Sequence, residues 1–260
     1  MRSIFQILTF TLCFWHFQSF SYAQNIINKC SICLEPLPAT FSIDAWNNPF
    51  HTYHEKEGIF CNSCSRIISE AVTQGGFSYS DGRHICTLCQ ATVVENEINI
   101  KKSYESVIEQ LHAIGIKNIS KKIPIKLINL IEFNKITKIN NHGNLKGYTK
   151  FNHANMKNKF EIFILFGLPK VEFEATLAHE LLHVWLEQNN FHIKSEIAEG
   201  FCNLGRSLIY ENDNTYFSKI HLNSMQTDTS LIYGSGYRKI KLIQKKLGWH
   251  ELIHNFQNIK

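Results

Sequence analysis

One stretch of ten residues decides the fold: Leu177-Ala178-His179-Glu180-Leu181-Leu182-His183-Val184-Trp185-Leu186. Its two histidines are four residues apart, slightly more than one helical turn, so a helix directs both imidazoles to one side, where they can bind one zinc ion. Glu180 then lies beside the open coordination position, where a carboxylate can act as a general base. The apolar residues around these side chains predict a long helix over 170–188.

A catalytic zinc ion needs a third protein ligand, and the sequence narrows the choice. The extended metzincin pattern would place a histidine at position 189, which is Asn189, so that class is excluded. Glu199, sixteen residues after His183 and followed directly by Gly200, resembles the third ligand of the gluzincins. Glu196 lies one turn earlier on the same predicted helix and is the alternative ligand or an outer carboxylate.

The chemistry expected of this site is hydrolysis of a peptide bond by a zinc-bound water, with Glu180 taking the proton and passing it to the leaving amine. A group that stabilises the oxyanion is also needed. Tyr233, Tyr237 and Arg238 are the candidates, although a tight turn with solvated side chains would equally explain this segment. The predicted strand over 160–166 leads straight into the active-site helix and could offer its edge to an extended peptide.

The remaining residue pattern predicts a mixture of helices and strands. A helical pattern begins at Tyr104, and β-branched and aromatic residues predict strands over 123–131, 145–151 and 160–166. Further helices are expected over 194–210 and 237–256. The last of these contains a second match to the histidine pattern, from His250 to His254, but only six residues follow it. No downstream glutamate can complete a site there, so we expect an amphipathic terminal helix.

Eight cysteine and histidine side chains before residue 90 form four short pairs: Cys30 and Cys33, His51 and His54, Cys61 and Cys64, and Cys86 and Cys89. Two pairs supply the four ligands of one tetrahedral site, so the set predicts two closed, structural zinc sites. Disulfides are the alternative, because an exported chain meets an oxidising compartment. The paired histidines, which no disulfide explains, favour zinc.

The spacing of the four pairs resembles a LIM domain, including Asp81-Gly82 shortly before the last pair. It departs from the LIM pattern at His54, where the fourth ligand is usually a cysteine, and in the six rather than two residues between His54 and Cys61. These pairs are followed by the histidine helix and then by Glu199. This order of parts resembles the DA-one family of LIM-containing zinc peptidases, which are ubiquitin-activated regulators of plant organ size.

The resemblance implies a minimal gluzincin peptidase that binds zinc through His179, His183 and Glu199 and uses Glu180 as the base. The plant proteins carry ubiquitin-interacting helices ahead of their LIM region, whereas here a signal-like segment runs almost directly into Cys30. Ubiquitin activation is therefore not expected to carry over to this chain.

The N-terminal residues have the character of an export signal. Met1-Arg2 gives a short positive start, 4–15 is mostly apolar, and Ser21-Tyr22-Ala23 predicts cleavage after Ala23. An uncleaved anchor is the alternative, but the apolar run falls short of the ~20 residues that a membrane span needs. We expect an exported protein, periplasmic or secreted, with no membrane span after cleavage.

Composition limits the remaining choices. The chain has 260 residues, 44% hydrophobic and 19% charged, with a formal charge of +5 and no block of five like charges. This composition is typical of globular proteins and argues against nucleic acid as the main partner.

Together these features predict an α+β chain: a signal peptide (1–23), a small zinc-ribbon, LIM-like module with two zinc sites (24–95), and a minimal zincin, gluzincin-like peptidase domain (96–260). Three zinc ions are expected, one catalytic and two structural. The expected substrate is a protein or peptide, and the LIM-like module would position it or bind a protein partner. The alternative function is a zinc-stabilised, non-catalytic protein-binding scaffold.

Overall fold

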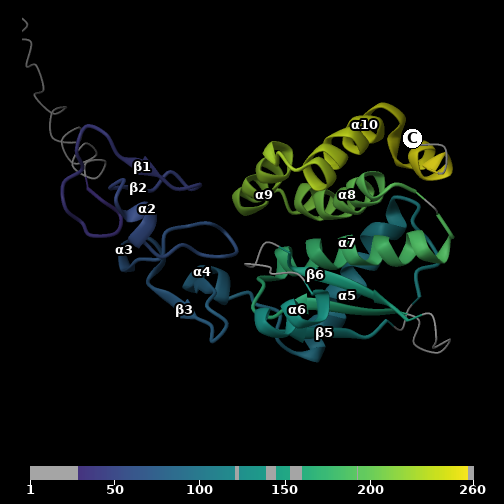
Figure 1. Ribbon diagram of the computed structural model, residues 1–260, viewed down its shortest axis with the longest axis horizontal. Helices are drawn as coiled ribbons and strands as arrows, with labels where there is room; N and C mark the ends of the chain where they lie inside the picture. The colour runs from purple at the N-terminus through teal and green to yellow at the C-terminus, as the bar shows by residue number, and fades with distance from the viewer. Residues whose placement is uncertain (1–28, 121–122, 139–144, 153–159, 192, 257–260) are drawn as a thin grey trace, which may run out of the picture.

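The computed structural model describes residues 29–120, 123–138, 145–152, 160–191 and 193–256 (Figure 1). It is a mixed α+β structure in which a smaller, cysteine-rich part lies beside a larger part built of helices and one sheet. The predicted signal peptide lies outside the described residues, so export remains a prediction. Within the described ranges, no helix combines the length and the apolar character needed to cross a membrane.

The cysteine-rich part is made of short elements that present the paired cysteines and histidines. Two antiparallel hairpins, β1 (Ser42–Ile43) with β2 (Pro49–Phe50) and β3 (Gly76–Ser78) with β4 (His84–Cys86), are joined by one-turn helices. These helices are α2 (His54–Glu57), α3 (Glu70–Thr73) and α4 (Thr87–Gln90). The core of this part consists largely of cysteine side chains, which is typical of a module held together by metal rather than by a large apolar core.

The larger part contains a three-stranded sheet with the order β5-β7-β6. β5 (Ile125–Ile128) runs parallel to β7 (Phe160–Leu165), and β6 (Gly147–Phe151) pairs antiparallel with the other side of β7. Because β7 is the central strand, the expectation that 160–166 offers a free edge is wrong. Its run of buried apolar residues suits a strand covered on both faces. The edge strand beside the histidine helix is β6.

Helices cover the sheet in two layers, as Figure 1 shows. α5 (Glu97–Ala113) and α6 (Leu130–Thr137) lie in the same half of the larger part as the sheet. α7 (Lys170–Gln188) carries the histidine pattern. Above α7 lie α8 (Ser195–Asp213), α9 (Tyr216–Thr227), the π-helix η1 (Leu231–Ser235) and α10 (Gly236–His254). The predicted helix over 170–188 is confirmed at both ends, whereas α6, α9 and η1 were not predicted.

Two glycines of α8 allow helices to approach it on two sides. A Cβ atom at Gly205 would lie 2.7 Å from the Leu182 side chain and 3.1 Å from the Ala178 carbonyl oxygen of α7. A Cβ atom at Gly200 would lie 2.4 Å from the carbonyl oxygen of Gly236, at the start of α10. Gly200, the residue after Glu199, therefore allows α10 to pack closely against α8. Gly205 allows the histidine helix α7 to do the same on another side.

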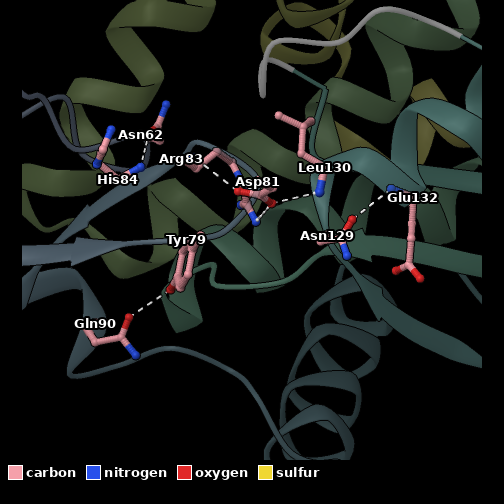
Figure 2. Close-up of polar contacts among 9 residues, drawn as sticks. All are labelled: Asn62, Tyr79, Asp81, Arg83, His84, Gln90, Asn129, Leu130 and Glu132. Carbon is pink, nitrogen blue, oxygen red and sulfur yellow. Dashed lines mark hydrogen bonds and ion pairs between the residues drawn. The ribbon is translucent and has the colours of Figure 1, made fainter.

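The two parts of the molecule meet through buried polar contacts, shown in Figure 2. Asp81, at the tip of the β3–β4 hairpin, pairs with Arg83 at 2.9 Å and accepts a 2.8 Å hydrogen bond from the backbone N–H of Leu130, the first residue of α6. On the other side, Trp46 packs edge-on against Tyr216 of α9, with ring centroids 4.9 Å apart. The cysteine-rich part is thus anchored to the helical part at both α6 and α9.

Candidate active site and metal centres

The structure brings His179, His183 and Glu199 together. The two histidine Nε2 atoms are 3.1 Å apart, and oxygens of Glu199 lie 3.3 Å from His179 Nε2 and 3.5 Å from His183 Nε2. Ligand atoms about 2.0–2.2 Å from a zinc ion in tetrahedral geometry are separated by about 3.3–3.6 Å. The histidine nitrogens and the Glu199 carboxylate therefore lie close to the spacing of three zinc ligands, and their donor set suits that metal.

The surroundings of His179 and Glu199 favour the ionisation states that bind metal, whereas those of His183 favour its protonated form, whose proton a metal ion would displace. Burial lowers the pKa of His179 and keeps its imidazole neutral. Burial alone would raise the pKa of Glu199, but its contacts with His179 and His183 outweigh this effect and hold the pKa well below the ordinary value. For His183, burial is outweighed by Cys202 and Glu199, and the pKa is raised. A neutral imidazole and an ionised carboxylate are ready ligands.

Glu196, the alternative third ligand, does not join this cluster. Its backbone carbonyl oxygen and Cγ face Gly236, where a Cβ atom would lie 2.3 Å and 3.3 Å from them. The carboxylate that the structure brings to the histidine pair is that of Glu199.

Glu180 is held against strand β6. Its side chain is 3% exposed, and its Oε2 accepts a 2.7 Å hydrogen bond from the hydroxyl of Thr149. A Cβ atom at Gly147 would lie 2.5 Å from the other carboxylate oxygen, so only glycine leaves room for this side chain. Neither Gly147 nor Thr149 could be identified from the sequence, because nothing in the local pattern indicates that β6 crosses the histidine helix at Glu180.

The three oxyanion candidates have different surroundings. Tyr233, in η1, is 41% exposed, and burial followed by the charge of Glu199 raises its pKa, which keeps the phenol protonated. Tyr237 is 3% exposed and its hydroxyl is in hydrogen-bond contact with Ser207 of α8. The Arg238 guanidinium binds the carbonyl oxygens of the 226–228 segment. Tyr237 and Arg238 thus have structural partners, and Tyr233 is the candidate whose pKa responds to the charges of the metal-ligand cluster.

Two buried polar atoms, Oδ1 of Asn203 and Nδ1 of the ligand candidate His179, have no hydrogen-bond partner among the described residues. The second histidine pattern belongs to no ligand cluster within the described part of the chain. His250 lies on α10 beyond Gly248, whose φ of 78° interrupts the helix, and its side chain is 90% exposed.

The eight paired side chains of the cysteine-rich part form two further clusters: Cys30, Cys33, His51 and His54, and Cys61, Cys64, Cys86 and Cys89. All of these cysteines are free thiols. The Cys64 and Cys86 sulfurs are 3.7 Å apart, and two sulfurs bound to one tetrahedral zinc ion are separated by about 3.8 Å. Both clusters can therefore hold zinc, with the pairing of residues that the spacing predicts.

His51 shows how the protein orients one of these ligands. Its Nδ1 lies 3.4 Å from the Cys33 sulfur, and its Nε2 lies 3.0 Å from the carbonyl oxygen of Pro36. An N–H at Nε2 donates to that carbonyl and leaves the Nδ1 lone pair free for a metal ion. Burial is the largest influence on Cys30 and would raise its pKa, but hydrogen bonds from the backbone of Cys33 and His51 lower it to about 7. A lowered thiol pKa favours the thiolate, the form that binds zinc.

Comparison with known proteins agrees with this arrangement. Over 87% of its length the chain is 23% identical to DA1-related 2 of Arabidopsis thaliana, covering 52% of that protein. It is 21% identical over 88% of its length to the LIM domain-containing protein HDR3 of Oryza sativa subsp. japonica, and 20% identical over 93% to Protein DA1 of A. thaliana. It covers 60% and 58% of these two relatives, so it spans little more than half their length.

No solved structure matches the chain. Residues 125–210, from β5 to the last turn of α8, match the family described as "DA1-like: Protein DA1". This segment contains β6, β7, the histidine helix and Glu199. The chain thus carries a DA1-like segment, and DA1-related and LIM domain-containing proteins are among its relatives.

Proposed function

We propose that the protein is a zinc-dependent peptidase of the gluzincin type. The observation that carries the proposal is the convergence of His179 Nε2, His183 Nε2 and the Glu199 carboxylate within 3.1–3.5 Å, with Glu180 on the adjoining position of α7. A structural zinc site is closed by four protein ligands, whereas three ligands leave one position for water or substrate. The ligand count therefore favours catalysis at this cluster and a structural role at the two others.

The residues of the site then have separate roles. Zinc held by His179, His183 and Glu199 would supply an acidified water and polarise the scissile carbonyl. Glu180 accepts a proton from the attacking water and delivers it to the leaving amine, and Thr149 holds the carboxylate in position for both transfers. Tyr233 donates its phenolic proton to the developing oxyanion.

A substrate peptide is expected to lie along β6, the edge strand beside α7. Its outer side has no strand partner among the described residues, so an extended peptide can pair with it as an added strand. β6 also carries Gly147 and Thr149 against Glu180, which brings a peptide on this edge close to the base. With export through the N-terminal segment, the substrates are proteins outside the cytoplasm.

The test is a comparison of the purified protein with a Glu180→Gln variant on an unstructured protein such as casein. We expect zinc-dependent cleavage by the first and at least a hundredfold slower cleavage by the second, because loss of general acid–base catalysis typically costs about 10²–10⁴-fold in rate. Circular dichroism and zinc content should be the same for both. Equal activity would show that cleavage does not depend on Glu180 and would overturn the proposed site, whereas no activity in either protein with the three sites filled would leave only a zinc-stabilised binding scaffold.

A further inference from the structure

A cavity of about 650 Å³ lies between the cysteine-rich part and helices α7, α8 and α9. Thr176, in its wall, lies one turn before Glu180 on α7, and both side chains contact the position of Gly147. Arg206, also in the wall, lies two turns after Glu199 on α8. A substrate side chain close to the scissile bond can therefore reach into this cavity.

Most charged groups in the wall of this cavity already have a partner. Glu172 is 2% exposed and forms an ion pair with Lys146, whose ammonium also donates to the carbonyl oxygen of Asn62 at 3.0 Å. The Asp228 carboxylate accepts a 2.8 Å hydrogen bond from the backbone N–H of Ser230.

Arg206 is the exception. Among the described residues its guanidinium forms no ion pair, and its Nε is buried without a hydrogen-bond partner. The Arg206 side chain is only partly buried. Its planar fork of donors matches the two oxygens of a carboxylate, so a carboxylate that enters the cavity can pair with it.

We propose that Arg206 forms a carboxylate-binding subsite, so that the enzyme prefers substrates with a carboxylate near the bond that it cleaves. The inference rests on the proposed peptidase function. The carboxylate is either an aspartate or glutamate side chain of the substrate or the free carboxylate at the end of a peptide chain, since both present the same two oxygens to the fork.

The cysteine-rich part forms the opposite wall of this subsite. Asn62 and Ser63, which lie between the ligands Cys61 and Cys64, line the cavity, and the backbone of Ser63 is in hydrogen-bond contact with His221 of α9. A zinc ion in the second cluster would fix this turn, and with it the width of the subsite. The cysteine-rich part thus takes part in selecting substrate.

The experiment uses matched synthetic peptides of casein sequence: each sequence with one acidic residue, the same sequence with that residue replaced by the amide, and the same sequence with an amidated C-terminus. Their affinities are measured by fluorescence anisotropy on the zinc-loaded Glu180→Gln protein, and their kcat/KM on the active protein. Arg206→Gln and Arg206→Lys are compared with Lys101→Gln, which removes one positive charge from the exposed face of α5.

We expect at least a tenfold preference for one of the carboxylate peptides over its amide, because hydrogen bonds to charged groups contribute about 1.5–3 kcal/mol. The preference should disappear in Arg206→Gln, weaken in Arg206→Lys and persist in Lys101→Gln. If the peptide with the side-chain amide binds more weakly, the subsite takes an acidic side chain. If the peptide with the amidated C-terminus binds more weakly, the subsite takes the end of a peptide chain. Equal affinity for acid and amide peptides, or a loss in Arg206→Gln that is the same for all peptides, would overturn the subsite. A binding preference without hydrolysis by the active protein would overturn the peptidase proposal and leave the subsite intact.

Discussion

The hydroxyl of Thr149, on edge strand β6, donates a 2.7 Å hydrogen bond to Oε2 of Glu180, on helix α7. The same hydroxyl lies 3.2 Å from the Glu180 backbone carbonyl oxygen. Both side chains are buried, so this contact is shielded from water and fixes the direction of the carboxylate. It connects the strand expected to bind substrate with the group expected to move the proton.

Replacing Thr149 with valine keeps the shape of the side chain and removes the donor. We expect kcat to fall about tenfold with little change in KM, since a buried hydrogen bond to a charged group contributes about 1.5–3 kcal/mol and the substrate does not contact it directly. Thr149→Ser keeps the hydroxyl and should retain most of the activity. Steady-state kinetics of both variants test the role, and an equal loss in both would indicate a packing effect instead.

Gly200 offers a test of how α8 is held next to the metal-ligand cluster. In Gly200→Ala the new methyl would lie 2.4 Å from the Gly236 carbonyl oxygen, which belongs to backbone and cannot turn away. We expect a loss of about 1–3 kcal/mol in the free energy of unfolding and weaker zinc binding, because Glu199 is the neighbouring residue. Denaturant unfolding and zinc titration measure the two effects. Unchanged values in both would contradict this account of the α8–α10 crossing.

Much of this architecture could be predicted because local sequence patterns determine it. The bounds of α7 follow from its apolar spacing, and the pairing of ligands in the two cysteine clusters follows from their separations in the chain. The spacing after His183 and the following glycine favoured Glu199 but left Glu196 as an alternative, and the placement of α8 beside α7 brings the Glu199 carboxylate to the histidine pair.

The parts that could not be predicted depend on contacts between distant segments. Strand order is one, since β7 looks like any buried strand until β5 and β6 are placed on its two sides. The role of Gly147 is another, because its lack of a side chain matters only once β6 crosses Glu180. Tyr237 and Arg238 were indistinguishable from Tyr233 in sequence, and only their packing against α8 and the 226–228 segment separates them.

The three metal clusters should respond differently to mutation. Cys86→Ser removes a ligand from a closed cluster whose cysteines form the core of the second hairpin, so we expect the loss of one zinc ion together with a clear fall in Tm. Glu199→Gln should also lower the zinc content by one, but with a smaller change in Tm, since α7 and α8 pack through a large apolar core. For each variant, the zinc content is measured by atomic emission and Tm by calorimetry. An equal fall in Tm for the two variants would contradict the division into structural and catalytic sites.

His221 predicts a pH dependence of stability. Burial lowers its pKa to about 4 in the folded protein, whereas the unfolded chain has the ordinary value of about 6.5. The unfolded state therefore binds a proton first as the pH falls, and His221 should make the protein progressively less stable between about pH 6.5 and pH 4, by at most about 3 kcal/mol. Other groups also titrate in this range, among them the ligand histidines, so the measurement is the difference between the wild type and His221→Asn, which cannot titrate. Urea unfolding at pH 7 and at pH 5 should give a smaller loss of stability for the variant, and the same loss in both proteins would show that His221 is not held neutral by its surroundings.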